Sequence, residues 1–301
     1  MEAYAAGAKF DCLLFDMDDT LYPLSLGINL ACRKNIQEYM LNKLRIEESQ
    51  VPRMCLDLYR EYGTTMAGLK VLGYGFDYDD FHACVHGTLP YEKVKPDPVL
   101  RQLLLSLPQR KIIFTNSDKA HAARVLEKLG LQDCFQGIVC FETLNPRPPT
   151  ETEKNSSGSA GTILCKPSLA SMEAVIEIAK LDAERTVFFD DSARNIAAGK
   201  AAGFRTVIVS VFSVSSPRVV RACVLQSTAD ADNRQPSMHG NLRMQVGSSA
   251  LVPGADVALE SIHNIKEALP ELWEVAAAAA AGDRVDAVLR STTAVETTVI
   301  A

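Results

Sequence analysis

The segment FDCLLFDMDDTLY, residues 10–22, constrains the fold more than any other part of the chain. Its apolar run, residues 12–15, leads directly into the carboxylates of Asp16, Asp18 and Asp19. An unbroken apolar run of this length is typical of a strand buried on both faces, as in a parallel sheet. Open α/β sheets place their ligands at the carboxyl ends of such strands. The segment therefore predicts a buried parallel strand with an acidic site at its end.

Three carboxylates this close in the chain repel one another unless a cation lies among them. A hard divalent ion that prefers oxygen ligands is the usual partner of such a cluster. The residues by themselves therefore predict a metal-dependent site in which one carboxylate could also act as a nucleophile.

Composition narrows the class of protein. The chain has 301 residues, enough for one large domain or a domain with an insert, and its 47% hydrophobic content supports a sizeable core. A net charge of −6 argues against nucleic-acid binding by bulk electrostatics. The eight cysteines form no CxxC pair, and no signal peptide or membrane-spanning run is apparent. We expect a soluble protein of the cytoplasm, or also of the nucleus, without a membrane or nucleic-acid partner; the oligomeric state stays open.

Strand and helix patterns alternate through most of the chain. The expected strands cover residues 12–15, 111–115, 137–141, 186–189 and 206–209. The helical patterns between them cover residues 99–107, 118–129, 168–181 and 192–202. Such alternation predicts an α/β fold, with a Rossmann-like parallel-sheet core and right-handed crossovers.

Helical spacing without strands marks residues 26–44, 51–72 and 78–86, and a proline-containing linker follows. We therefore expect a core formed by residues 1–25 and 95–275 and a helical cap formed by residues 26–94. Within the core we expect a mobile loop at 145–162, a disordered insert at 210–246 and a loop with a helix at 255–273. Residues 210–246 could be a retained non-coding stretch of the gene. The last segment, 276–301, is expected to be a tail of low order.

Further candidate site residues lie at the ends of the other predicted strands. Thr115 and Asn116 follow the second strand, and Asp190 and Asp191 follow the fourth. Lys166, in the segment CKPS, stands just before a helix. Because the carboxyl ends of parallel strands meet at one edge of a sheet, these groups are expected to lie close to the first acidic cluster.

This set of motifs resembles the haloacid dehalogenase superfamily in its phosphatase branch. The resemblance rests on DMDDT (residues 16–20), Thr115, Lys166 and FFDD (residues 188–191), in that order along the chain. The helical segment matches the position of the cap in the first cap class (C1) of this superfamily. Two further segments, GTLPYEKVKPDP (87–98) and FTNSDKAHAARVLEKLG (114–130), look more specifically like the pyrimidine 5′-nucleotidase subgroup.

The resemblance implies a Mg²⁺-dependent phosphomonoesterase whose substrate is a small phosphorylated molecule. In such an enzyme Asp16 attacks phosphorus and forms an aspartyl-phosphate. Asp18 protonates the leaving oxygen and then activates water. Thr115, Asn116 and Lys166 would bind the phosphoryl group, and Thr115 and Lys166 would also act in catalysis. The subgroup favours a nucleoside 5′-monophosphate, with a pyrimidine base preferred, or a similar small ester.

The resemblance also implies the ligands of the Mg²⁺ ion. These are Asp16, the backbone carbonyl of Asp18, and the pair Asp190 and Asp191, with Asp191 as the favoured direct ligand. Asn195, one helical turn further on, could orient that pair.

Two other functions are open alternatives. A non-catalytic regulatory protein could retain this fold, although the intact set of acids argues against it. A haloacid-type dehalogenase needs neither a metal nor a general acid at position 18, so the presence of Asp18 favours phosphoryl transfer. His82 and His86, four residues apart, could bind zinc, but packing within the cap is the favoured interpretation.

Overall fold

The computed structural model describes residues 9–146, 162–209 and 252–274. Within these residues six strands form one parallel sheet in the order β3-β2-β1-β4-β5-β6. The expected α/β class and the first strand are therefore confirmed. The strands are β1 (Cys12–Phe15), β2 (Arg110–Phe114), β3 (Gly137–Val139), β4 (Thr186–Asp190), β5 (Arg205–Val209) and β6 (Val257–Leu259).

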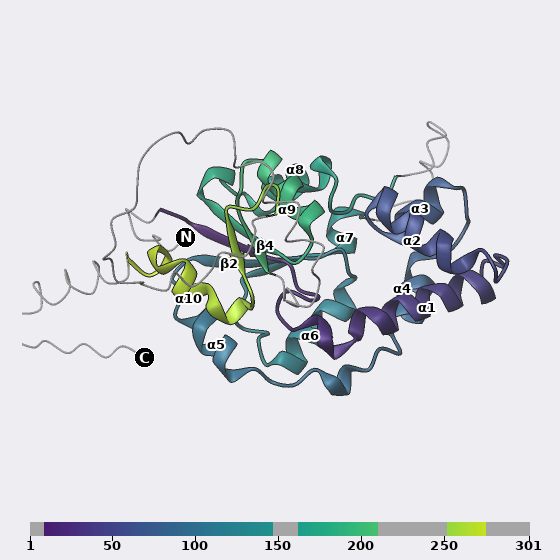
Figure 1. Ribbon diagram of the computed structural model, residues 1–301, viewed down its shortest axis with the longest axis horizontal. Coiled ribbons are helices and arrows are strands. Elements are labelled where there is room, and N and C mark those ends of the chain that lie inside the picture. Colours follow the sequence, from purple (N-terminus) through teal and green to yellow (C-terminus); the bar gives the residue numbers. More distant parts are fainter. Residues whose placement is uncertain (1–8, 147–161, 210–251, 275–301) are drawn as a thin grey trace, which may run out of the picture.

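The central strand β1 is buried because helices cover both faces of the sheet (Figure 1). Leu13 and Phe15 pack on one side, in the same apolar cluster as residues of two helices, α5 (Pro98–Leu105) and α6 (Lys119–Leu129). Leu14 packs on the other side, because successive side chains of a strand alternate between its faces. The helices on that side are α8 (Leu169–Ala179) and α9 (Ala193–Ala201).

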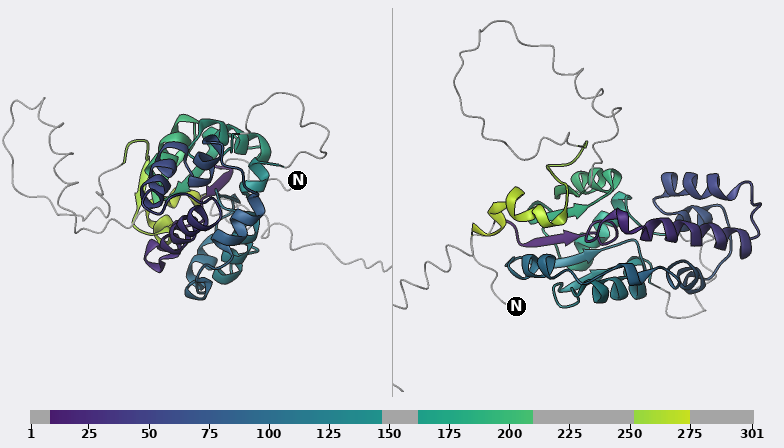
Figure 2. Two further views of the ribbon diagram at one scale, coloured as in Figure 1. Left: turned by 90° about the vertical axis from the view of Figure 1, so that its right-hand side faces the viewer. Right: turned by 60° about the horizontal axis from the view of Figure 1, so that its bottom comes forward.

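A helical insert leaves the sheet directly after β1 and lies beyond its carboxyl edge. In Figure 2 the strand β1 points toward this insert, which occupies one end of the molecule. Its helices share an apolar cluster of their own, which also includes Phe141 and Cys165 of the sheet-bearing part. The helices of the insert are α1 (Ile28–Asn42), α2 (Val51–Tyr62), α3 (Thr65–Val71) and α4 (Tyr78–His86).

The expected single helix over residues 51–72 is wrong, because the chain breaks between α2 and α3. Gly63 has a φ of 87°, a conformation that favours glycine. An added Cβ at this position would lie 2.5 Å from the backbone oxygen of Lys166, so glycine also permits a close approach. Thr64 then caps α3 by accepting a hydrogen bond from the Ala67 amide at 3.1 Å.

The sixth strand is a second departure from expectation, since residues 255–273 were expected to be a loop and a helix. Residues 257–259 instead pair with β5, and short helical turns follow, including α10 (Ile265–Ala268). Asp256 fixes the start of this strand, because its carboxylate accepts from the amide of Thr206 at 2.9 Å. Three residues are too few to show a strand period in the sequence.

Three earlier predictions lie wholly or mostly outside the described residues: the loop at 145–162, the insert at 210–246 and the tail at 276–301.

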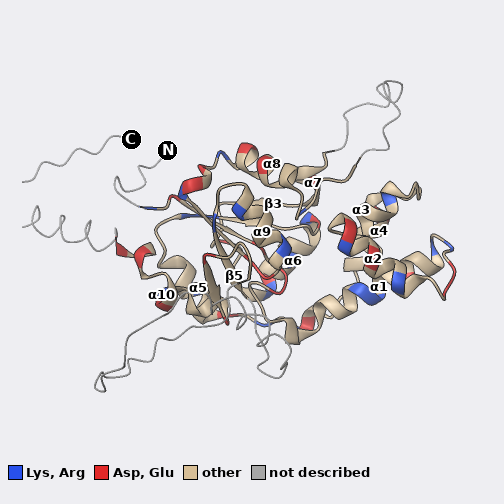
Figure 3. Cartoon of the chain, turned by 45° about the horizontal axis from the view of Figure 1, so that its top comes forward, with Lys and Arg blue, Asp and Glu red and all other residues tan. Residues whose placement is uncertain are grey.

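In the part that is described, no helix is both long enough and apolar enough to cross a membrane. Basic and acidic residues are interspersed on both the sheet-bearing part and the helical insert (Figure 3).

Substitution of Gly199 by alanine tests the packing that holds α9 against β4. An added Cβ would meet the buried ring of Phe188 at 2.6 Å, and Phe188 is fully buried. We expect Gly199→Ala to lower the free energy of unfolding by about 1–3 kcal/mol through overpacking, measured by urea denaturation. Gly137→Ala is the matched control, because nothing lies within 4 Å of its added Cβ. Equal stability of the two variants would contradict this account of the packing.

Candidate active site

Three strand ends bring the predicted acids and Thr115 to one edge of the sheet. Asp16 follows β1, Thr115 follows β2, and Asp190 ends β4. The strand β1 pairs in parallel with both β2 and β4, so these three positions are neighbours. The amide of Asp16 continues the ladder by donating to the Phe189 carbonyl at 2.8 Å. The local backbone therefore presents the acids side by side.

Lys166 lies among these acids although it comes from a loop distant in sequence. Its Nζ donates to Oδ1 of Asp16 at 2.7 Å, to Oδ2 of Asp190 at 2.8 Å and to the Phe114 carbonyl at 2.8 Å. The residue is only 1% exposed. The three ammonium protons thus have three acceptors, which is what a buried lysine requires. Thr20 donates to the other oxygen of Asp16 at 2.8 Å.

One lysine does not balance the charge of the surrounding carboxylates. Loss of hydration alone would lower the pKa of Lys166, but the charges of Asp16 and Asp190 outweigh it and hold this pKa above its ordinary value. Burial nevertheless raises the pKa of Asp16 to about 7. Burial, followed by the charges of Asp16 and Asp190, raises the pKa of Asp191 to about 9. The site therefore has more negative charge than the lysine neutralises.

The donor set suits a hard divalent cation. Asp16, Asp190 and Asp191 each offer a carboxylate oxygen, and these atoms lie within 4.8 Å of one another. Oδ1 of Asp19 is also buried without a hydrogen-bond partner. All-oxygen ligands of this kind are the ones Mg²⁺ prefers, and a cation would relieve the excess charge. By this test the residues fit the predicted Mg²⁺.

The two adjacent acids of the fourth motif have different surroundings. Asp190 is fully buried and accepts from Lys166, from the Ser192 amide at 2.8 Å and from Asn195 Nδ2 at 2.9 Å. Asn195, expected to orient both acids, therefore bonds Asp190 and not Asp191. Among the described residues, the Asp191 carboxylate has no hydrogen-bond donor, and it is partly exposed. Asp191 thus has the freer oxygens of the pair.

Asp18 is held by three donors from three different segments. Tyr22 donates to Oδ1 at 2.6 Å, Ser117 donates to Oδ2 at 2.8 Å, and Nε2 of His121 lies 2.7 Å from Oδ1. Burial alone would raise the pKa of Asp18. The charge and hydrogen bond of His121, with the bonds of Tyr22 and Ser117, outweigh burial and keep the pKa of Asp18 below its ordinary value. The side chain is still 30% exposed, so it can reach a ligand.

The side chains at the second motif, Thr115 and Asn116, form hydrogen bonds with backbone groups of the site. The hydroxyl of Thr115, a residue only 1% exposed, accepts from the Ser117 amide at 3.1 Å. Asn116, predicted to bind substrate, makes two bonds to Lys166: Nδ2 donates to its carbonyl at 3.0 Å, and Oδ1 accepts from its amide at 2.8 Å. The Asn116 side chain therefore positions the loop that carries Lys166, called the lysine loop below.

Sequence reasoning did not single out Thr20, Ser117 or His121 as site residues. Nor did it include Tyr22 among the candidate site residues. Each of these four contacts an acid of the site. Thr20 lies within the first motif, DMDDT, but was given no role there, and the other three lie outside the four motifs. A buried acid requires donors, but the spacing in the chain does not say which residues supply them.

The histidines of the insert pack rather than meet at a common point. The His82 ring lies 4.6 Å from the Phe141 ring in an edge-on arrangement, and Nδ1 of His86 bonds the Asp118 carboxylate. Burial lowers the pKa of His82 to about 4. Packing, the favoured alternative for these two histidines, describes these contacts better than zinc binding.

The chain resembles curated proteins over most of its length. It is 27% identical over 232 residues to Phosphate metabolism protein 8 of Saccharomyces cerevisiae, covering 73% of this chain and 66% of the yeast protein, just under two thirds. It is also 27% identical over 217 residues to a Phosphoglycolate phosphatase of Rhodospirillum rubrum, covering 66% of this chain and 78% of that protein.

A crystal structure of a HAD phosphatase from Thermococcus onnurineus matches with a TM-score of 0.47 and 16% identity, covering 86% of this chain and 97% of that chain. The family described as "Hydrolase: haloacid dehalogenase-like hydrolase" matches residues 10–203. This match confirms the superfamily that the motifs predicted, whereas the pyrimidine 5′-nucleotidase subgroup stays a prediction. Because the matched residues make up well over half of the 301-residue chain, this protein belongs to the haloacid dehalogenase-like hydrolase family.

Proposed function

We propose that this hydrolase is a Mg²⁺-dependent phosphomonoesterase that forms an aspartyl-phosphate on Asp16. The observation that carries the proposal is the pair of carboxylates two residues apart, held by different partners. Asp16 lies against Lys166 and Thr20, whereas Asp18 lies against Tyr22, Ser117 and His121. Two acids in such distinct surroundings suit a nucleophile and a proton-transfer group.

The chemistry follows from these positions. An Asp16 oxygen bonds to phosphorus while the bond from phosphorus to the leaving oxygen breaks, and Asp18 gives that oxygen a proton. Water then attacks the aspartyl-phosphate, Asp18 takes its proton, and phosphate leaves with Asp16 restored. The ionised form of Asp18 suits this second step. A dianionic ester beside Asp18 favours the protonated form that the first step needs, because like charges raise a carboxyl pKa.

The charge of the phosphoryl group needs neutralising before a carboxylate can approach it. The Lys166 ammonium group, already placed between Asp16 and Asp190, supplies part of this. Asp16, Asp191 and the backbone carbonyl of Asp18 would hold Mg²⁺, with Asp190 supporting them through Lys166 and Asn195. When bound, Mg²⁺ would withdraw charge from the phosphoryl oxygens and relieve the repulsion among the acids.

We further propose that residues 26–94 act as a lid over the site. Gly63 of the insert closely approaches the backbone of Lys166 and the ring of Pro167. In the last turn of α2, just before Gly63, the carbonyls of Tyr59 and Arg60 accept hydrogen bonds from Nη1 of Arg194, at 3.2 and 2.6 Å. These contacts support a closing element that excludes water from the reacting groups.

A nucleoside 5′-monophosphate is the substrate class that we propose, with a pyrimidine base preferred. The support is the resemblance of segments 87–98 and 114–130 to the pyrimidine 5′-nucleotidase subgroup. In the structure these two segments meet beside Asp18, since the Tyr91 hydroxyl lies 2.7 Å from Nδ1 of His121.

Replacement of Asp16 tests the nucleophile. Asp16→Asn preserves shape but removes the attacking charge, so phosphate release should fall by at least about 10³-fold. Asp57, an exposed carboxylate in the insert that pairs with Arg53 at 3.4 Å, offers the matched control: Asp57→Asn should retain full turnover. Free phosphate measured against time reports both. Full activity of Asp16→Asn would refute the covalent mechanism.

Removal of the metal tests the proposed ligands. A chelator should abolish phosphate release and added Mg²⁺ should restore it. Mg²⁺ should also raise the melting temperature of the protein, because a ligand that binds only the folded state stabilises it. This rise should be lost or reduced in Asp191→Asn and retained in Asp57→Asn. If neither the activity nor the melting temperature changes with the chelator or with Mg²⁺, the proposed metal dependence is wrong.

A panel of phosphate esters with Mg²⁺ tests the substrate class. Cytidine and uridine 5′-monophosphates should give a higher kcat/KM than purine 5′-monophosphates and phosphoglycolate, the last chosen because of the name of one relative. A preference for phosphoglycolate would overturn the nucleotide proposal but keep the phosphatase. Metal-independent halide release from a 2-haloacid would favour a dehalogenase, and no turnover of any ester would favour a non-catalytic protein.

A further inference from the structure

The Asp18 carboxylate depends on a histidine that belongs to none of the four motifs. His121 lies in the first turn of α6, only 2% exposed, with Nε2 at 2.7 Å from Oδ1 of Asp18. Tyr22 and Ser117 complete the set of donors. Of the three, Tyr22 and Ser117 use hydroxyl groups, which can rotate, whereas the planar ring of a buried histidine fixes the direction of its bond.

The orientation of His121 depends in turn on a second contact. Its other ring nitrogen, Nδ1, lies 2.7 Å from the hydroxyl of Tyr91, and that hydroxyl donates to the His86 carbonyl at 3.1 Å. The Arg124 guanidinium lies over the Tyr91 ring, 4.6 Å from its centroid. The His86 ring lies 4.6 Å from the His121 ring. Both ring nitrogens of His121 are therefore engaged, so the ring has one preferred orientation.

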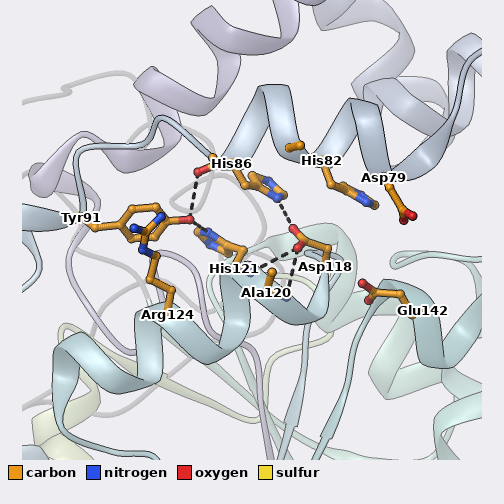
Figure 4. Close-up of a pocket in the computed structure, with 11 residues that line it drawn as sticks. Asp79, His82, His86, Tyr91, Asp118, Ala120, His121, Arg124 and Glu142 are labelled. Carbon is orange, nitrogen blue, oxygen red and sulfur yellow. Dashed lines mark hydrogen bonds and ion pairs between the residues drawn. The ribbon is translucent and has the colours of Figure 1, made fainter.

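These contacts join the insert to the sheet-bearing part (Figure 4). His86 ends α4, the last helix of the insert, and Tyr91 begins the turn Tyr91–Lys93 by which the chain returns. His121 and Arg124 lie on α6, which follows β2. The groups line a pocket of about 270 Å³ between α4 and α6. A continuous set of hydrogen bonds thus runs from the last helix of the insert to Asp18.

We propose that His121 is a positioning residue for Asp18 and that Tyr91, at the return of the insert, fixes His121 for this task. The inference rests on the proposed function, because it assigns the device that aims the proton-transfer group. Its physical basis is that proton transfer requires the carboxylate within hydrogen-bond reach of the leaving oxygen, and a small misplacement weakens it strongly.

The test compares two esters of similar size whose leaving groups differ in basicity. The leaving group of p-nitrophenyl phosphate departs readily without a proton, whereas that of phenyl phosphate is more basic and benefits from one. Misplacing Asp18 should therefore slow phenyl phosphate more. We expect His121→Phe to lower the ratio of kcat/KM for phenyl phosphate to kcat/KM for p-nitrophenyl phosphate on the order of tenfold, because kcat/KM reports the step in which the leaving group departs and not the later hydrolysis of the common intermediate.

Three further variants separate positioning from general structural damage. His121→Gln keeps a donor at a similar reach and should recover much of the ratio. Tyr91→Phe deletes one hydroxyl and keeps the ring, so it tests the proposal even if His121→Phe does not fold; it should lower the ratio in the same direction by a smaller factor. His82 is a buried histidine that lines the same pocket but has no bond to Asp18, so His82→Asn should leave the ratio unchanged.

The outcomes distinguish this inference from the proposed function. An unchanged ratio in folded His121→Phe and in Tyr91→Phe, while Asp18→Asn lowers it, would overturn the inference and leave the phosphatase intact. An equal fall in kcat/KM for both esters, with an unchanged ratio, would mark a structural role and overturn it as well. No turnover of either ester by the unaltered protein would overturn the proposed function and the inference together.

Discussion

The buried ammonium group of Lys166 is the interaction on which the site depends. It joins the ends of three central strands, through Asp16 after β1, the Phe114 carbonyl at the end of β2 and Asp190 at the end of β4. A buried charge is tolerated only when its partners satisfy it fully. Because the lysine has all three acceptors and is 1% exposed, the acids can be held close together in a water-poor setting. The raised pKa values of Asp16 and Asp191 show that this lysine alone does not balance them.

The topology of the sheet and the position of the insert both bring residues to the carboxyl edge of the central strands. Parallel pairing of β1 with β2 and β4 aligns the carboxyl ends of three strands. The insert begins shortly after Asp16, at the same edge of the sheet. The insert then contacts the lysine loop at Gly63, where a Cβ would meet a backbone oxygen. The residue whose charge partly offsets that of the acids is therefore also one that the insert touches, so the position of the insert and the electrostatics of the site are physically linked.

The second acid, Asp18, is linked to a different part of the insert, near its C-terminal end. Its contact with His121, and the contact of His121 with Tyr91, extend from the site to the segment by which the chain returns. Two different segments of the insert, one at Gly63 and one at Tyr91, are thus connected to the two acids by separate routes, through Lys166 and through His121. Asp16 is surrounded by a lysine and a threonine, and Asp18 by a histidine, a tyrosine and a serine. This difference in partners gives two carboxylates, two residues apart, distinct pKa values, and it suits them to the two different tasks that we propose for them.

Local pattern determined the parallel-sheet class, most helices and the strand ends that supply the acids, because a buried strand and an amphipathic helix each leave a periodic signal in the chain. It did not predict the break at Gly63 or the strand β6, since these depend on a close backbone approach and on the free edge of β5. Likewise, the sequence by itself identified Asp16, Asp18 and Lys166 as candidates. Only the tertiary structure decided that Asn116 holds the lysine loop and that His121 holds Asp18. Hydrogen bonds between residues 50 to 103 positions apart leave no local period, because they form only when the folded chain brings their partners together.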